Sequence, residues 1–527
     1  MDFFKALGSG IKFDRKKFQR DIQLFEKPTG GPVSLNAGAN CEPGAELDFF
    51  AEAKPVAKAN PAEETNDGGD AAKAEEEEAD ALEPFHGPSE IQAFRDRHRI
   101  AYYGEPSVEP VRSFAMLFER FTFKAAVRRN FDRLKFTKPT PIQLQALPLA
   151  LAQQDFVACA PTGSGKTLAY VLPMLHILSE PQRVGYRACI VTPTRELATQ
   201  VYELLKVLSQ GTKFRINHLV KARPTQEGKE TDQVKKYDIL ISTPLRLMYE
   251  IEHDLIDLSQ VQYLVLDEAD QLLELGYLQQ VDTILAACTH SGLRKQLFSA
   301  TIPPEIEDLA QSIMRDPVRL FIGFRNAATE DVEQRLVFVG QEAGKMVEIR
   351  NMVQRGFAPP VLIFVQSIDR AKELFHELVY DGLNVDVIHS QRTKAQRDNV
   401  IANFRAGRIW VLIATELMSR GIDFKGVNLV INYDFPQTVQ SYIHRVGRTG
   451  RAGRKGIAVT YFTREDAPYL RSVVNVIRDS GGEVPEWMLE LKPATEEKSK
   501  LLKIRPPPRQ PIITKPSAVK WKMAQLK

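Results

Sequence analysis

The sequence predicts an α/β protein with two tandem parallel sheets flanked by helices, and with disordered or irregular extensions at both ends. Its 527 residues, 43% of them hydrophobic, supply enough apolar material for two or three domains. Short apolar or β-branched runs recur along the middle of the chain, each followed by a turn and a helical stretch. A polar break at residues 323–331 divides these runs into two series.

Each predicted strand is short and apolar on both faces, as is typical of buried parallel strands. The first series comprises residues 156–160, 188–192, 238–242, 263–266 and 295–299. The second series comprises residues 361–365, 385–388, 410–414, 429–432 and 457–461. Because such sheets bind ligands at the carboxyl ends of their strands, we expect the functional residues there.

The composition narrows the class of protein. The 70 Lys and Arg residues nearly balance 67 Asp and Glu residues, which excludes a histone-like polycation. The sequence shows neither an apolar run of membrane-spanning length nor a secretory signal, so we expect an intracellular protein without membrane contact. Four widely spaced cysteines favour buried, reduced thiols over a metal site or disulfides: Cys41, Cys159, Cys189 and Cys288.

The two ends of the chain differ from its middle. Residues 1–112 form a predicted N-terminal extension that we expect to be largely disordered. This extension is acidic around residues 63–83, which fits a solvated spacer or a docking tail. Residues 483–527 form a basic tail suited to phosphate contacts or to a targeting signal. The predicted domains between these extensions span residues 113–323 and 332–482.

A loop of small residues follows the predicted strand at residues 156–160 and favours phosphate binding. The loop and the start of the next helix read Pro161, Thr162, Gly163, Ser164, Gly165, Lys166 and Thr167. Backbone N–H groups of such a loop close around a phosphate, and the positive end of the helix adds attraction. Lys166 would reach the β and γ phosphates, and the Thr167 hydroxyl would ligate Mg²⁺.

Two carboxylates follow the predicted strand at residues 263–266. Asp267 is placed to hold Mg²⁺, partly through water, and Glu268 is placed to orient and deprotonate an attacking water. An acidic N-terminal cap of a helix is the alternative, and both interpretations are compatible with each other.

With these motifs, the sequence resembles the DEAD-box ATP-dependent RNA helicases from about Phe118 to about Asp479. The resemblance implies two RecA-like domains, an ATP-binding domain followed by a helicase C-terminal domain, with ATP and Mg²⁺ as cofactors. It also implies that Gln143 pairs with the adenine edge, since a carboxamide both donates and accepts hydrogen bonds. Phe136 resembles the aromatic that stacks on the base, and the family commonly has Gly at the position of Lys135.

The resemblance also assigns residues to RNA binding and to coupling. It implies contacts to RNA without base reading by Pro193, Thr194, Arg195, Thr243, Arg246, Gln366, Arg397 and Thr415. It implies coupling between nucleotide and RNA by Ser299, Thr301, Asp270, His444 and Arg445. For Thr194 and Thr243, capping of the next helix is the alternative.

The second domain is expected to complete the nucleotide site. Gly421 and Asp423 resemble the family's ribose contact, and Arg448 and Arg451 resemble its arginine fingers. Surface arginines in weak ion pairs are the alternative for the last two. The implied catalytic residues are therefore Lys166, Asp267, Glu268, Arg448 and Arg451.

The resemblance thus implies an ATP-dependent RNA helicase that couples ATP hydrolysis to local duplex unwinding or to remodelling of RNA–protein complexes. An ATP-gated RNA clamp and a DNA helicase are the alternatives. Residues 90–104 resemble a segment of the Rok1-like subgroup, which implies pre-ribosomal RNA as partner, small-subunit assembly and a location in the nucleolus within the nucleus. An amphipathic helix packed on the core is the alternative for this segment. We expect a monomer, with pre-ribosomal proteins as possible partners.

Overall fold

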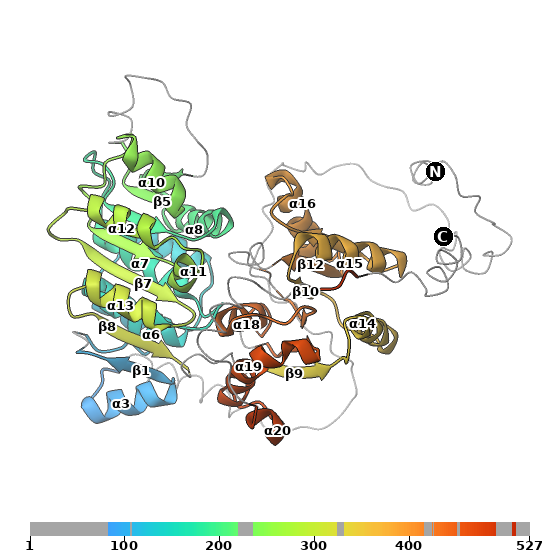
Figure 1. Cartoon of the computed structure of the whole chain (residues 1–527). Helices are drawn as coiled ribbons and strands as arrows, with labels where there is room; N and C mark the ends of the chain where they lie inside the picture. The colour runs from blue at the N-terminus through green and yellow to red at the C-terminus, as the bar shows by residue number, and fades with distance from the viewer. Residues whose placement is uncertain are drawn as a thin grey trace, which may run out of the picture. The chain divides into compact units, whose positions relative to one another are not determined.

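The computed structural model describes residues 83–105, 108–219, 236–323, 331–415, 424, 426–450, 454–491 and 509–512. They form two sheets, each with helices on both faces (Figure 1). The two sheets correspond to the two predicted series of strands, so the predicted fold class is confirmed.

The first sheet has eight strands in the order β1-β8-β2-β7-β6-β3-β5-β4. Their bounds are β1 Ile100–Tyr103, β2 Phe156–Cys159, β3 Ala188–Val191, β4 Ile216–Leu219, β5 Ile239–Ser242, β6 Tyr263–Leu266, β7 Arg294–Ser299 and β8 Val318–Ile322. All neighbours pair in parallel except β1, which runs antiparallel to β8. The carboxyl ends of β2, β7 and β6 therefore lie side by side, which gathers the residues that follow them.

Helices cover both faces of the first sheet. One core cluster joins the strands to α4 Phe114–Arg120, α5 Ala125–Arg133, α6 Pro141–Leu151, α7 Lys166–Leu178 and α8 Arg195–Leu208. The other joins them to α10 Pro244–Glu252, α11 Ala269–Glu274, α12 Leu278–Ala287 and α13 Pro304–Ile313. Successive strand residues alternate between the two clusters, as with Phe156 and Val157, because side chains alternate across a strand.

The second sheet has six parallel strands in the order β11-β12-β10-β13-β14-β9. Their bounds are β9 Val332–Phe338, β10 Val361–Val365, β11 Val385–Ile388, β12 Val411–Thr415, β13 Leu429–Asn432 and β14 Gly456–Phe462. One face packs on α14 Gly344–Arg355 and α15 Ile368–Tyr380. The other packs on α16 Lys394–Arg405, α18 Val439–Val446, α19 Ala467–Asp479 and α20 Glu486–Leu489; the short 3₁₀ helix η1 spans Arg464–Asp466.

The ten predicted strands all occur, with bounds that differ by at most one residue at either end. Four further strands were not predicted: β1, β4, β8 and β9. Three of them, β1, β4 and β9, lie at sheet edges. An edge strand keeps one side open to water and tolerates polar residues, so β9, with the sequence VEQRLVF, lacks the apolar run expected of a buried strand.

The first sheet begins earlier in the chain than the predicted start of the domain at residue 113. Helix α3 Pro88–Arg97 and strand β1 precede that position, and β1 pairs with β8 along its whole length. Arg95 is 5% exposed and its Nε donates to Gln145 Oε1 at 3.0 Å. Helix α3 therefore packs on the core, as the alternative for residues 90–104 predicts, and β1 adds an edge strand; this packing is compatible with the resemblance to the Rok1-like subgroup. The acidic stretch up to residue 82 lies outside the described residues.

Three of the four cysteines, Cys159, Cys189 and Cys288, are buried free thiols, as predicted, and Cys41 lies outside the described residues. Within the described ranges, none of the helices is long and apolar enough to cross a membrane.

Candidate nucleotide and RNA sites

The phosphate loop joins β2 to α7, as the sequence predicts. Gly163 and Gly165 adopt φ angles of 80° and 89°, a region that residues with a Cβ rarely occupy. A Cβ at Gly165 would lie 2.4 Å from Gln143 Nε2, so any other residue here would also have to displace the Gln143 amide. Lys166 is 9% exposed, and its Nζ donates to the carbonyls of Ala160 at 2.8 Å and Ser299 at 3.1 Å.

Gln143 lies against this loop from the start of α6. It closes a capping box with Thr140, whose backbone N–H donates to Gln143 Oε1 at 3.0 Å. Gln143 Nε2 donates to the carbonyl of Gly165 at 3.0 Å, so the predicted adenine-reading residue also braces the phosphate loop. Phe136 packs on Phe131, and Lys135 before it has a φ of 53°, so Lys keeps a backbone conformation that Gly adopts more readily.

The two predicted catalytic acids are buried after β6. Tyr170 donates its hydroxyl to Asp267 Oδ2 at 2.8 Å, and the N–H of Glu268 donates to Asp267 Oδ1 at 2.9 Å. Burial raises the pKa of Asp267 to about 6, and the neighbouring carboxylate of Glu268 adds to the rise. Glu268 precedes α11 with a φ of 48°, and its buried Oε2 receives no hydrogen bond from the residues that the structure describes.

The five predicted coupling residues fall into two groups. Asp270 Oδ2 accepts from the Thr301 hydroxyl at 2.8 Å and from the Thr301 N–H at 3.0 Å. The N–H of Asp270 donates to Ser299 Oγ at 3.3 Å, and His444 Nε2 donates to Asp270 Oδ2 at 3.0 Å. Burial alone would raise the pKa of Asp270, but His444 and Thr301 hold it well below its ordinary value. Arg445 instead donates to the carbonyl of Asp434 at 2.8 Å.

Helix α18 also meets the phosphate loop at its C-terminal end. The hydroxyl of Thr162 donates to the carbonyl of Gly447 at 2.9 Å, and a Cβ at Gly447 would lie 2.0 Å from that hydroxyl oxygen. The next residue, Arg448, is 4% exposed, and its Nε donates to the carbonyl of His444 at 3.2 Å. The other predicted residues of this group, Arg451, Gly421 and Asp423, lie outside the described residues.

Four of the five predicted RNA residues of the first domain border a common hollow of about 460 Å³. It is lined by Pro193, Arg195, Thr243, Pro244, Leu245, Arg246, Tyr249 and Tyr277. Thr194 is not among the lining residues, and its Oγ1 accepts from the N–H of Leu197 at 3.3 Å, so this side chain caps α8. Thr243 is a lining residue of the hollow and precedes α10, and its side chain forms no capping hydrogen bond with that helix.

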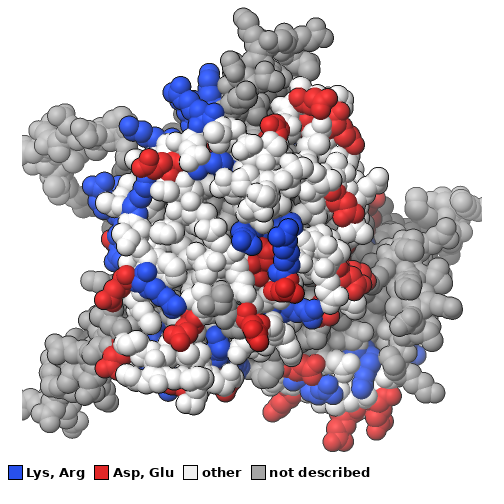
Figure 2. All heavy atoms as spheres, turned by 90° about the vertical axis from the view of Figure 1, so that its left-hand side faces the viewer, with Lys and Arg blue, Asp and Glu red and all other residues white. Residues whose placement is uncertain are grey.

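Two of the three predicted RNA residues of the second domain lie at or directly after the ends of its strands, and the third lies on a helix. Gln366 follows β10, Thr415 ends β12 and is 7% exposed, and Arg397 belongs to α16. Arg397 Nη2 forms an ion pair with Glu196 of α8 at 2.7 Å. On the face of the molecule in Figure 2, which is the left-hand side of Figure 1, Lys and Arg side chains of the described residues are interspersed with Asp and Glu.

Two functional neighbours escaped the sequence analysis. Tyr170 lies on α7 and holds Asp267, but its position within an apolar helix gives no polar signal. Gln271 is fully buried, and its Nε2 lies 3.0 Å from Nδ1 of His444, so it contacts the same imidazole as Asp270. Its place directly after the predicted acids was the signal that could have found it.

The sequence matches two family models. These are the DEAD/DEAH box helicase model at residues 140–309 and the helicase conserved C-terminal domain model at residues 344–453. The chain is 44% identical to the ATP-dependent RNA helicase ROK1 of Eremothecium gossypii, with 100% of this chain and 96% of that protein covered. It is 42% identical to the probable ATP-dependent RNA helicase DDX52 of Mus musculus, with 98% and 95% covered.

Solved structures give the same result for the fold. S. cerevisiae Dbp5 bound to RNA and ADP BeF3 aligns with a TM-score of 0.60 and 26% identity, over 73% of this chain and 98% of that one. Mss116p bound to ssRNA and AMP-PNP aligns with a TM-score of 0.62 and 25% identity, over 74% of this chain and 83% of that one.

Proposed function

Because this chain belongs to the DEAD/DEAH box helicase family and is an ATP-dependent RNA helicase, a hydrolase acting on ATP, we propose that it remodels precursors of ribosomal RNA during small-subunit assembly in the nucleolus. High identity to two RNA helicases over nearly the whole chain supports the activity. The resemblance of residues 90–104 to the Rok1-like subgroup supports the substrate. We further propose that the protein acts as a monomer beside pre-ribosomal proteins.

The proposed nucleotide site combines the loop after β2 with residues that follow neighbouring strands. The backbone N–H groups of residues 162–167 and the N-terminal end of α7 hold the phosphates, and Pro161, which has no N–H, begins the loop. Lys166 moves from the carbonyls of Ala160 and Ser299 to the phosphate oxygens, which are stronger acceptors because they are charged. Gln143 reads the adenine edge, and Phe136 stacks on the base.

The acids after β6 fit a divalent cation. A buried carboxylate with a raised pKa, such as Asp267, gains from a nearby positive charge, and the Thr167 hydroxyl supplies a second oxygen ligand. Mg²⁺, when bound, neutralises charge on the phosphates. Glu268 then orients the attacking water and accepts its proton through Oε2, the buried atom without a partner among the described residues.

The hydrogen bonds around Asp270 support the proposed coupling between ATP and RNA. Thr301 and Ser299 lie at the end of β7 beside the phosphate loop, and His444 belongs to α18 of the second domain. A ligand that shifts α18 therefore changes the contacts of Asp270, three residues after Asp267, and both ligands bias one equilibrium. RNA held by its phosphates in a non-helical path loses its partner strand locally.

A substitution of Arg448 tests whether this residue is an arginine finger, as we propose. Replacing Arg448 with Ala removes a guanidinium that we place at the γ-phosphate in the transition state, so turnover should fall by about 10³- to 10⁵-fold. The affinity for ATP should change far less, because the contact strengthens only as the charge develops. Steady-state hydrolysis and equilibrium binding of a fluorescent ATP analogue measure the two effects, and equal losses in both would contradict a finger.

The proposed substrate is tested by mapping the RNA that crosslinks to the protein in cells. Recovery mainly of small-subunit ribosomal RNA precursors is expected, and recovery mainly of other RNA would contradict the proposal. Release of a labelled strand from short duplexes, measured beside ATP hydrolysis on one preparation, separates unwinding from an ATP-gated clamp. Hydrolysis stimulated equally by DNA and RNA strands of one sequence would favour the DNA alternative.

A further inference from the structure

Residues 509–512 pack against the second domain, although they are distant in sequence from the residues they touch. Arg370 Nη1 donates to the carbonyl of Gln510 at 2.5 Å, and the N–H of Ile512 donates to Glu373 Oε2 at 2.8 Å. The side chain of Ile512 is 7% exposed and belongs to the core cluster under α14 and α15. A backbone acceptor, a backbone donor and an apolar side chain therefore fix this segment.

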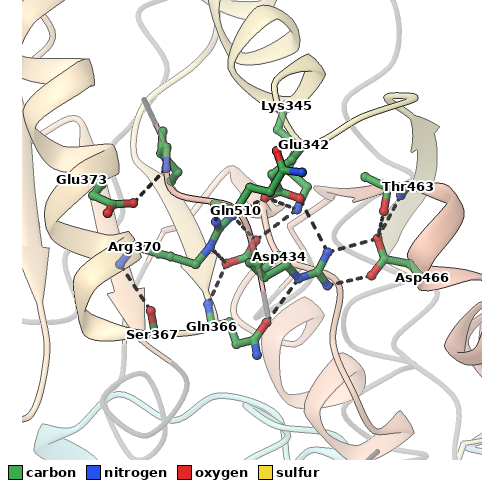
Figure 3. A network of polar contacts seen from close by, with 12 residues as sticks. Glu342, Lys345, Gln366, Ser367, Arg370, Glu373, Asp434, Thr463, Asp466 and Gln510 are labelled. Atoms are coloured by element: carbon green, nitrogen blue, oxygen red, sulfur yellow. Dashed lines mark hydrogen bonds and ion pairs between the residues drawn. The ribbon is translucent and has the colours of Figure 1, made fainter. Parts of the chain in front are cut away.

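Arg509 extends from this segment into a buried group of charges, which we call the Asp434 cluster: Glu342, Lys345, Arg370, Asp434, Asp466 and Arg509. Figure 3 shows the labelled carboxylates of this cluster converging from separate segments. The side chain of Arg509 is 3% exposed, and its Nη2 donates to Asp466 Oδ1 at 2.6 Å. Asp466 is itself fully buried, so the pair holds the planar guanidinium in one orientation.

The Nε donor of this guanidinium reaches the predicted RNA contact. Arg509 Nε donates to Gln366 Oε1 at 3.2 Å. The backbone N–H of Gln366 donates to Asp434 Oδ2 at 2.9 Å, so the cluster holds both the main chain and the side chain of this residue. Gln366 follows directly after β10, at the carboxyl end of a central strand, where ligands of parallel sheets bind.

We propose that Arg509 is a positioning residue for RNA binding, which sets the orientation of the Gln366 amide. With its oxygen held by Arg509, the amide is left to present its NH₂ group to the backbone of a bound RNA. Phosphate oxygens only accept hydrogen bonds, so an amide turned the other way would meet them with its own oxygen. This inference rests on the proposed RNA contact of Gln366.

The test uses the full chain with Arg509→Lys and Gln366→Ala, singly and combined. Lysine keeps a positive charge beside Asp466 but lacks the planar fork that reaches Gln366 at the same time. The dissociation constant of a labelled single-stranded RNA is measured with a non-hydrolysable ATP analogue. Each single variant should bind this RNA about 3- to 10-fold more weakly. The double variant should bind no more weakly than Gln366→Ala, because Arg509 acts through Gln366.

Two controls separate positioning from stability. Arg464→Lys changes an exposed arginine two residues from Asp466 and should leave RNA affinity unchanged. Ile512→Ala weakens the packing of the segment, so it should lower the midpoint of unfolding clearly, while the RNA affinity should change little. An Arg509→Lys variant that loses stability but binds RNA normally would overturn the inference.

The three variants also distinguish a failure of the positioning role of Arg509 from a failure of the proposed RNA contact of Gln366. If Gln366→Ala weakens RNA binding and Arg509→Lys does not, the positioning role alone is wrong. If the effects of the two substitutions on RNA affinity simply add, Arg509 contacts RNA by another route and the inference also fails. If Gln366→Ala leaves RNA affinity unchanged, the proposed RNA contact itself is wrong.

Discussion

Buried carboxylates occur in both domains, but their charges are compensated differently. Near the nucleotide site, burial raises the pKa of Asp267 to about 6, and Glu268 keeps a buried oxygen without a hydrogen bond from the described residues. In the second domain, Asp434 accepts from Lys345 at 3.1 Å and from Arg370 at 2.7 Å. Burial alone would raise the pKa of Asp434, but these cations hold it well below its ordinary value.

This difference distinguishes a reactive site from a structural one. A buried acid without a cation costs free energy, which a fold tolerates where a ligand later supplies the missing charge or proton. A buried acid enclosed by cations is already satisfied and has little left to offer a ligand. Asp267, whose pKa stays raised despite the opposing charge of Lys166, and Glu268, whose Oε2 receives no hydrogen bond from the described residues, are therefore the acids that we propose for the chemistry. The Asp434 cluster instead holds segments of the second domain together.

The largest expected effect is on turnover, from Glu268→Gln. Glutamine has the shape of glutamate but cannot accept the proton of the attacking water, so RNA-stimulated ATP hydrolysis should fall by about 10²- to 10⁴-fold. No described residue donates a hydrogen bond to Glu268 Oε2, so the substitution removes no such bond and takes away a buried charge. The midpoint of thermal unfolding should therefore stay unchanged or rise. Glu305→Gln, an exposed acid on α13, is the control for the lost charge. Retained RNA-stimulated turnover in Glu268→Gln would remove the catalytic assignment.

The opposite pattern is expected for Asp434→Asn. This change removes one of the two carboxylates that Lys345 and Arg370 share, the other being that of Glu342, and leaves more buried positive than negative charge around them. Unfolding should therefore require about 3–5 kcal/mol less free energy at pH 7. The folded-state pKa of Asp434 is depressed, so its contribution is present above the unfolded pKa near 4 and is lost as pH falls below it. The difference between variant and parent should therefore shrink in acid.

Denaturation followed by tryptophan fluorescence measures this effect selectively. All three Trp residues of the chain, at positions 410, 487 and 521, lie beyond the first domain. The control is Glu333→Gln, which removes an exposed ion pair with Arg335 and should change stability by less than about 0.5 kcal/mol. Equal losses of stability in both variants would show that burial does not separate the two kinds of acid.

The same two regions show what the sequence could predict. The phosphate loop and the acids after β6 were found because each is a run of adjacent residues at the end of an apolar strand. The Asp434 cluster was not found, because Lys345 and Asp434 are 89 positions apart and Arg370 and Asp434 are 64 apart. Charged residues make up 26% of the chain, so composition cannot indicate which of them pair inside a core. Only the folded chain selects these partners.

A third kind of acid, Glu196, gives the smallest expected effect. Its ion pair with Arg397 at 2.7 Å is partly buried, with side chains 17% and 14% exposed, and it occupies a guanidinium that we assign to RNA. Glu196→Gln should release Arg397 and strengthen RNA binding by about 2- to 5-fold at low salt, with the gain declining as salt rises.

Two further variants decide whether the ion pair itself causes this gain. Glu203→Gln removes an exposed charge from the same helix, α8, and should leave RNA affinity unchanged. In an Arg397→Ala background, Glu196→Gln should have no effect, because the guanidinium that it releases is already absent. A gain that persists in that background would mean that Glu196 simply repels the phosphates of RNA. Glu196 would then act on RNA through its own negative charge, and its ion pair with Arg397 would not control RNA binding.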